Sequence, residues 1–259
     1  MKTLDVLIST FGSRVQDISN LLLEPIEGVR YLVGHQCASN IDISKLNFLE
    51  RRDVFYYALE STGVTKSRNY LLNKATSDIV YFCDDDIVLD VDCFKTIVES
   101  HSKNKSQVIT FIVNDLDGNP RGRYPNSESN RSYANILSVG TIEISLKREC
   151  YESVRFSEDM GAGTDIPIGD EAVFLADCIR NDMKILFVPT VICSHPLESS
   201  GSSVSETSVF ARGVAFRRVF GWCGWFILLP FFLKRAKLFT IDDGMIKSFF
   251  IFVSGFNFK

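Results

Sequence analysis

The feature that most constrains the fold of this chain is the alternation of short apolar runs with stretches of helical periodicity. Runs typical of buried strands occur at residues 4–9, 29–33, 54–58, 79–83 and 108–113. Residues 65–74 and 93–102 have the spacing of helices and lie between some of these runs. Strands that alternate with helices predict an α/β fold, with a mostly parallel central sheet between two layers of helices.

The second half of the chain begins with a polar excursion. Residues 114–135 are rich in Asn, Ser, Gly, Pro and Arg, and residues 117–120 read Asp-Gly-Asn-Pro, which is a strong turn signal. Beyond this loop the pattern predicts a strand, a helix and a last strand that stops before Pro189, at residues 139–146, 170–181 and 185–188. We expect the core to end near His195.

Composition limits the classes of partner and the compartment. The chain has 259 residues, 46% of them hydrophobic, which is enough for one sizeable core. Its net charge of -4 argues against nucleic-acid binding, which requires the neutralisation of many phosphates. The seven cysteines include no Cys-x-x-Cys pair, so we expect reduced thiols. A charge at Asp5 inside the first apolar run is atypical of a signal peptide, so we expect a cytoplasmic protein.

Three consecutive carboxylates, Asp84, Asp85 and Asp86, follow the apolar strand at residues 79–83. Adjacent negative charges repel one another, and a hard divalent cation relieves that repulsion. Ligands of parallel sheets gather at the carboxyl ends of the strands, which is where these residues are expected. The alternative is a solvated acidic turn.

The segment before this strand carries a resemblance to a known family. It reads Gly63-Val64-Thr65-Lys66-Ser67-Arg68-Asn69 and precedes a helix that leads through Asp78 into the acidic strand. This order resembles family 2 inverting glycosyltransferases of the GT-A fold, whose typical run is Gly-hydrophobic-x-x-x-Arg-Asn, a helix and a strand ending in Asp-x-Asp. The first strand, ending in Ile8-Ser9-Thr10-Phe11, is similar to the family's nucleotide-binding start, and the matched elements span residues 4 to 196.

The resemblance implies a GT-A fold that binds a nucleotide sugar and a divalent cation, Mn²⁺ or Mg²⁺. Asp86 and Asp84 would hold the metal beneath the diphosphate. The nucleotide-sugar-binding residues that it implies are Ser9, Thr10 and Phe11 beside the nucleobase, and Arg68, Asp84 and Asp85 near the rest of the donor. The alternative for Arg68 is an ordinary surface or helix-capping arginine.

A second acidic pair, Asp170 and Glu171, precedes Ala172-Val173-Phe174 at the start of a predicted helix. The family has Glu-Asp-x-x-Phe here, with the second acid as catalytic base, so the resemblance makes Glu171 the base, while the exchange of acid types leaves Asp170 open. A base is needed because the acceptor hydroxyl loses a proton as it attacks. The alternative is that both acids only stabilise the helix N-terminus.

One histidine joins the expected metal site. His195 follows the last predicted strand, where the family often places a histidine that contacts the metal or the diphosphate. Imidazole is a good ligand for manganese-like ions, and a structural histidine is the alternative.

The C-terminal tail has a different character. Residues 199–203 read Ser-Ser-Gly-Ser-Ser, a flexible composition, and residues 203–206 have the spacing of a capping box. Residues 222–233 are apolar with basic flanks, too short to span a bilayer that needs about 20 residues, so we expect them to lie in a membrane interface. A core-packing or dimer-forming helix is the alternative.

We therefore expect a GT-A catalytic domain at residues 1–198, with a nucleotide-sugar half (1–113) and an acceptor half (114–198), and a helical membrane-associated segment at 199–259. The resemblance, closest in kind to bacterial O-antigen and capsule enzymes, implies an inverting hexosyltransferase. It would use a UDP-sugar donor and a saccharide acceptor carried by a polyprenyl diphosphate, at the inner face of the cell membrane. The alternatives are a sugar-nucleotide nucleotidyltransferase, whose basic glycine-rich loop residues 10–14 match poorly, and a noncatalytic saccharide-binding relative.

Overall fold

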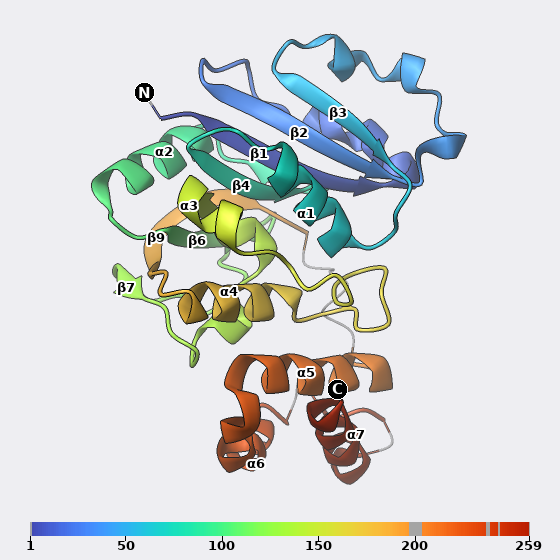
Figure 1. Ribbon diagram of the computed structural model, residues 1–259, viewed down its shortest axis with the longest axis vertical. Coiled ribbons are helices and arrows are strands. Elements are labelled where there is room, and N and C mark those ends of the chain that lie inside the picture. Colours follow the sequence, from blue (N-terminus) through green and yellow to red (C-terminus); the bar gives the residue numbers. More distant parts are fainter. Residues whose placement is uncertain (1, 197–203, 237–238, 243, 259) are drawn as a thin grey trace.

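A nine-stranded sheet organises the computed structural model, which describes residues 2–196, 204–236, 239–242 and 244–258 (Figure 1). The strand order is β3-β2-β1-β4-β8-β6-β9-β5, with β7 paired to β9. The strands are β1 (Leu4–Phe11), β2 (Val29–Gln36), β3 (Val54–Leu59), β4 (Ile79–Asp84), β5 (Val88–Leu89), β6 (Val108–Asn114), β7 (Ser129–Asn130), β8 (Ile144–Lys147) and β9 (Ile185–Ser194). β1 pairs in parallel with β2 and β4, β2 with β3, and β6 with β9, which confirms a mixed α/β fold with a mostly parallel sheet.

Helices cover both faces of this sheet. Alternate residues of each strand point to opposite sides, and the apolar side chains on each side pack against a separate set of helices. In β1, Val6 and Ile8 join one buried cluster with η1 and α2, whereas Leu7 joins another with α1, α3 and α4. The helices are α1 (Val64–Lys74), α2 (Cys93–Lys103), α3 (Arg148–Ser153), α4 (Asp170–Arg180), α5 (Glu206–Phe220), α6 (Trp225–Lys234) and α7 (Met245–Asn257). Short 3-10 turns connect them: η1 (Gly12–Asn20), η2 (Ala38–Asn40), η3 (Ile43–Lys45), η4 (Asn47–Glu50), η5 (Ile136–Ser138), η6 (Thr141–Glu143) and η7 (Gly221–Gly224).

The predicted elements differ from the structure in three places. After the first strand, the spacing of Val15 and Ile18 predicts a helix; the structure has the 3-10 segment η1 there, with both side chains buried. The strand expected from residue 139 begins only at Ile144, because η6 occupies the residues before it. β9 continues through Pro189 to Ser194, and its register against β6 shifts there. A proline, which has no N–H to donate, is tolerated at such an irregularity.

The core extends beyond His195, contrary to expectation. α5 packs on α4, and Ala211, Val214 and Val219 belong to the same buried cluster as α4. The division into domains at residues 1–198 and 199–259 stays a prediction, and the serine-rich segment 199–203 lies outside the described residues.

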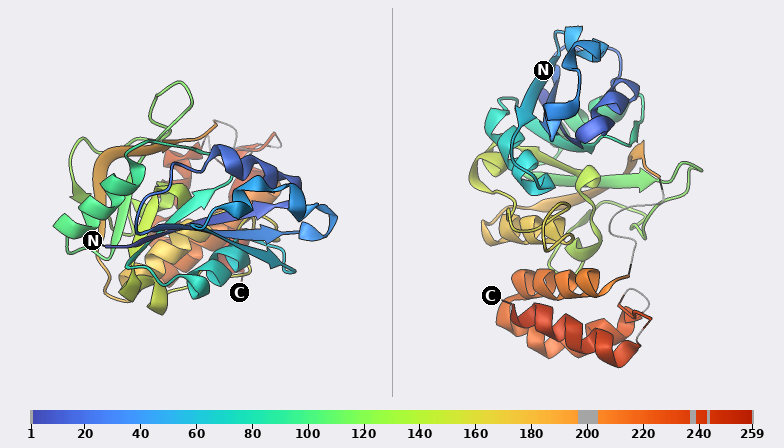
Figure 2. Two further views of the ribbon diagram at one scale, coloured as in Figure 1. Left: turned by 90° about the horizontal axis from the view of Figure 1, so that it is seen from above. Right: turned by 90° about the vertical axis from the view of Figure 1, so that its right-hand side faces the viewer.

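α5, α6 and α7 form a layer at one end of the molecule (Figure 2). α5 and α7 approach so closely that an added Cβ at Gly213 would lie 2.1 Å from the Phe252 carbonyl oxygen, and one at Gly255 would lie 2.1 Å from that of Phe210. An aromatic cluster that includes Phe216 fills the layer's interior. Contiguous helical residues Glu206–Lys234 are long and apolar enough to cross a membrane, and 28% of the apolar window is buried. One such helix among the described residues is weak evidence for a membrane span, because the core helices of soluble proteins have similar length and composition. Within residues 222–233, Leu228 and Phe232 are buried whereas Trp222 and Phe226 are exposed, so membrane association of this segment stays a prediction.

Candidate active site

A cavity of about 790 Å³ gathers the acidic and basic side chains that the sequence singled out. It opens where β1 and β4 end and where α4 begins (Figure 1). β1 contributes Ser9, and the strand β4 and the turn after it contribute Asp84 and Asp86. Its wall also includes Arg68 of α1, Asp170 and Glu171 of α4, and His195 just after β9. Residues separated by up to 186 positions in the chain therefore face one space.

Asp84, Asp86 and His195 form a cluster that could hold a metal ion. One potential ligand atom of each residue lies within 4.8 Å of the others. His195 Nε2 is 3.2 Å from Asp86 Oδ1, and its Nδ1 is 2.5 Å from the carbonyl oxygen of Pro196. A carbonyl can only accept, so Nδ1 carries a hydrogen and the neutral ring presents Nε2 as a ligand. Two carboxylates and one imidazole suit a divalent cation.

The electrostatics of this cluster are those of a site prepared for positive charge. The hydrogen bond from His195 lowers the pKa of Asp86, against the effect of burial. Burial lowers the pKa of His195, but its contacts with Asp86 and the Pro196 carbonyl outweigh that effect and raise the pKa overall. A proton and a metal ion would therefore compete for the same position between these two side chains.

Arg68 links the metal cluster to the acids of α4. Its guanidinium donates to Asp84 Oδ1 at 3.3 Å through Nη2 and to Asp170 Oδ2 at 2.8 Å through Nη1. The side chain is 7% exposed, so the interpretation of Arg68 as an ordinary surface arginine is wrong. Asn69, the next residue, exchanges two hydrogen bonds with the backbone of Phe156, and the Arg68 guanidinium lies over the Phe156 ring. The Arg-Asn pair thus anchors α1 beside the cavity.

Asp170 and Glu171 open α4 but have different surroundings. Asp170 is 3% exposed and committed to Arg68. Burial and the repulsion of Glu171 raise the pKa of Asp170, and Arg68 partly offsets them. Glu171 is more exposed, and its Oε1 accepts a hydrogen bond of 2.8 Å from the Thr141 hydroxyl. Of the two, Glu171 is the carboxylate that a molecule in the cavity can reach more readily.

Three of the expected donor-binding residues are absent from the described residues that line this cavity, namely Thr10, Phe11 and Asp85. Asp85 is buried, where it accepts hydrogen bonds from the Thr10 hydroxyl at 2.5 Å and Arg14 Nε at 3.1 Å. Phe11 is 49% exposed at the end of β1. Because Asp85 is buried, the acidic stretch is not simply a solvated turn, and the roles of these three residues in donor binding stay predictions.

Sequence reasoning missed other residues of the cavity wall: Arg14, Arg121, Gly140 and Thr141. Arg14 reaches Asp85 at 2.7 Å and lies 3.9 Å from Asp86. Arg121 belongs to the polar excursion at 114–135, whose composition indicated only a loop. Thr141 fell inside a predicted strand, where a threonine carries no special signal. An arginine three residues after the first strand was a usable signal, because it follows an end of the sheet where ligands gather.

A family model matches part of this chain. Residues 42–157 match the model of the family described as glycosyl transferase family 2. The expected resemblance to family 2 glycosyltransferases is confirmed. This match favours a glycosyltransferase over a sugar-nucleotide nucleotidyltransferase. In a search of the curated proteins, no sequence matches the chain.

Among solved structures, the chain is similar to TarS of S. aureus. For the TarS 1-349 structure the identity is 13% and the TM-score 0.64, with 85% of this chain and 66% of that one covered. The TarS 1-349 complex with UDP matches at 14% identity and a TM-score of 0.63, with 85% of this chain and 66% of that one covered. The complex with UDP-GlcNAc matches at 13% identity and a TM-score of 0.62, with 85% of this chain and 67% of that one covered. The chain spans only 40% of a longer TarS structure. At this identity the likeness establishes the fold alone, a mixed α/β fold with a mostly parallel sheet.

Proposed function

We propose that this chain is a metal-dependent, inverting glycosyltransferase that moves a hexose from a UDP-sugar to a saccharide acceptor. The observation that carries the proposal is the common cavity, into which the Asp84, Asp86 and His195 cluster and the carboxylate of Glu171 both face. A metal-binding group and a base at one cavity meet the two needs of glycosyl transfer, a stabilised leaving group and a deprotonated acceptor.

The donor end of the cavity is the side of β1 and β4. Asp84, Asp86 and His195 would hold a divalent cation, Mn²⁺ or Mg²⁺, which when bound neutralises charge on the departing diphosphate. Arg68 keeps Asp84 in place and adds positive charge beside the phosphates. Ser9, with Thr10, Phe11 and Asp85 around the end of β1, would contact the nucleotide. The UDP and UDP-GlcNAc complexes of TarS support a uridine nucleotide as donor carrier.

Glu171 is the proposed catalytic base. It would take the proton of the acceptor hydroxyl as the acceptor oxygen bonds to the anomeric carbon and the bond from that carbon to the UDP oxygen breaks. One displacement inverts the anomeric configuration. Asp170 serves less well because the Arg68 guanidinium occupies it at 2.8 Å in a buried position. We assign Asp170 to positioning Arg68.

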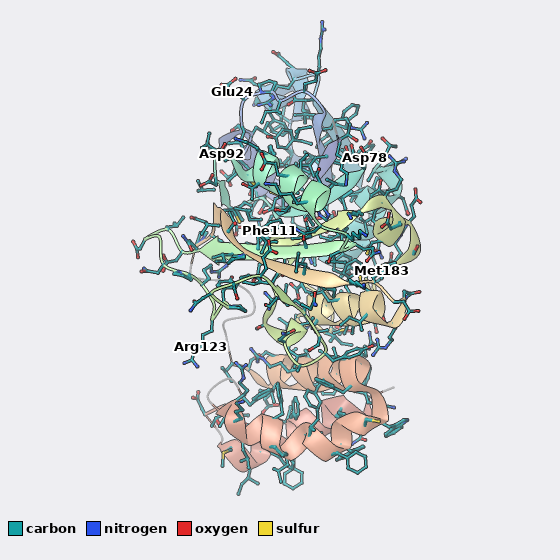
Figure 3. All side chains as sticks on the ribbon, turned by 90° about the vertical axis from the view of Figure 1, so that its left-hand side faces the viewer. Glu24, Asp78, Asp92, Phe111, Arg123 and Met183 are labelled. Carbon is teal, nitrogen blue, oxygen red and sulfur yellow. The ribbon has the colours of Figure 1, made fainter. Side chains whose placement is uncertain are left out.

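The C-terminal layer supports a lipid-linked acceptor. α6 and α7 leave a row of large apolar side chains exposed, among them Phe226 (86%), Ile246 (75%) and Phe250 (66%). Figure 3 shows side chains projecting from the outer surface of this layer. Residues 204–259 contain eight Lys and Arg but three Asp and Glu, whereas the chain as a whole is acidic. Such a surface suits an anionic membrane interface, so we place the protein peripherally at the cytoplasmic face of a membrane, in surface polysaccharide synthesis.

The test is transfer from a panel of UDP-hexoses and UDP-N-acetylhexosamines to saccharide and lipid-linked acceptors, with Mn²⁺, with Mg²⁺ and with chelator. Glu171→Gln should lower kcat at least about 100-fold while UDP binding, measured by calorimetry, stays unchanged. NMR of the product should show the inverted anomer. If Glu171→Gln retains full activity, and Asp170→Asn loses activity but still binds UDP as the unmodified protein does, the base is Asp170.

A further inference from the structure

We propose that Thr141 is the positioning residue of this site, and that it aims the carboxylate of Glu171 at the acceptor hydroxyl. This inference rests on the proposed function, because it concerns the orientation of the proposed base. Thr141 lies on the cavity wall and is 3% exposed, and its hydroxyl donates to Glu171 Oε1 at 2.8 Å. The remaining oxygen, Oε2, is then the one available to accept the acceptor's proton.

Thr141 can orient another side chain only if its own place is rigid, and η6 is held from both ends. On one side the hydroxyl of Tyr81, a buried residue of β4, donates to the Ile142 carbonyl at 2.9 Å. On the other, Glu143 Oε1 accepts from the Gly140 backbone N–H at 3.1 Å. The two contacts flank Thr141: the first attaches η6 to strand β4, and the second closes the short turn on itself. The hydroxyl therefore has little freedom to follow a displaced carboxylate.

Glu143 is itself fastened by buried partners from the polar excursion. The Tyr124 hydroxyl donates to Glu143 Oε1 at 3.2 Å, and Arg131 Nη2 lies 3.8 Å from Glu143 Oε2. Tyr124 stacks on Phe187 of β9, and the Arg131 guanidinium lies over the same ring. Burial of a carboxyl group is unfavourable unless hydrogen bonds or an opposite charge offset it, and these contacts supply both to Glu143. They join the excursion to η6, which carries Thr141.

A free carboxylate at a helix N-terminus has several rotamers of similar energy, and a single fixed donor selects one of them. Donation from Thr141 leaves the basic oxygen of Glu171 in a set direction, so the proton transfer needs no reorientation of the carboxylate. Positioning errors near 1 Å at a reacting group cost about 100-fold in rate. Loss of the Thr141 hydroxyl should therefore affect the chemical step and leave donor binding alone.

The experiment compares Thr141→Val, which keeps the shape and removes the hydroxyl, with Thr141→Ser, which keeps the hydroxyl. Thr96→Val makes the same change on α2, outside the cavity, and controls for the effect of the substitution on the fold. Each full-length variant is assayed with the UDP-sugar and acceptor that the unmodified protein uses best, and UDP binding is measured by calorimetry. We expect Thr141→Val to lower kcat about 10- to 100-fold with the donor KM and the UDP Kd within twofold. Thr141→Ser should restore kcat to within about threefold.

Three outcomes would overturn the inference, and they differ from failure of the proposed function. If Thr141→Val keeps full kcat, or if it weakens UDP binding in proportion to its loss of rate, Thr141 has no positioning role. If Thr141→Ser is as slow as Thr141→Val, the methyl group rather than the hydroxyl matters. If the unmodified protein transfers no sugar from any donor with either metal, the proposed function itself is wrong and this inference falls with it.

Discussion

The burial of Glu143 predicts a specific pH dependence of stability. Burial raises the pKa of Glu143 from an ordinary 4.5 to about 7, although the Gly140 N–H, Arg131 and the Tyr124 hydroxyl favour its ionised form. A carboxyl group whose pKa is higher in the folded state than in the unfolded state stabilises the fold fully below the unfolded pKa. This contribution is lost as the pH rises through the folded pKa. For these two values the loss between pH 5 and pH 8 is on the order of 2 kcal/mol.

Glu143→Gln removes that titration and keeps an acceptor for the Gly140 N–H. The free energy of unfolding in urea, measured from pH 5 to pH 8, should therefore fall by an amount on the order of 2 kcal/mol less in Glu143→Gln than in the unmodified protein. The absolute stability of the variant is not diagnostic, because Arg131 loses its counter-charge. Comparing how the free energy of unfolding changes with pH in the two proteins removes the contribution of every group that titrates equally in both. Parallel curves would show that Glu143 is ionised at pH 5 and would refute this reasoning.

Two further predictions concern the metal cluster and the C-terminal layer. Asp86→Ala should lower metal-dependent turnover at least about 100-fold. The melting temperature should not change, since the Asp86 side chain is 41% exposed. Full activity of the unmodified protein in the presence of chelator would contradict a role for the metal. Phe226→Ser combined with Ile246→Ser should weaken co-sedimentation with phosphatidylglycerol vesicles about tenfold or more, because each side chain would bury its apolar surface in the interface. Val91→Ser, at another exposed position, should bind as the unmodified protein does, and equal binding by all three proteins would contradict membrane docking through this face.

Local signals were enough to place most of the elements that carry the site. The apolar runs predicted β1, β2, β3, β4 and β6 to within a few residues. β1, β2, β4 and β6 are largely buried, and a strand buried on both faces is apolar along most of its length, whereas β3 has only its two end residues buried. The carboxylates after β4 and at the start of α4 could be expected near one edge of the sheet, since ligands of parallel sheets gather at the strand ends. Very short elements were missed, among them the two-residue strand β7 and the three-residue 3-10 turn η6, because so few residues show no periodic pattern.

What the sequence by itself determined is the order of strands and helices, the acidic and arginine motifs, and the family to which they point. Only the tertiary structure decided which carboxylate pairs with Arg68, that Asp85 turns inward to Thr10, and that Thr141 meets Glu171. The physical reason is range. Strand and helix patterns come from neighbours along the chain, whereas each of these contacts joins residues 30 to 102 positions apart and depends on strand register and on how α4 packs.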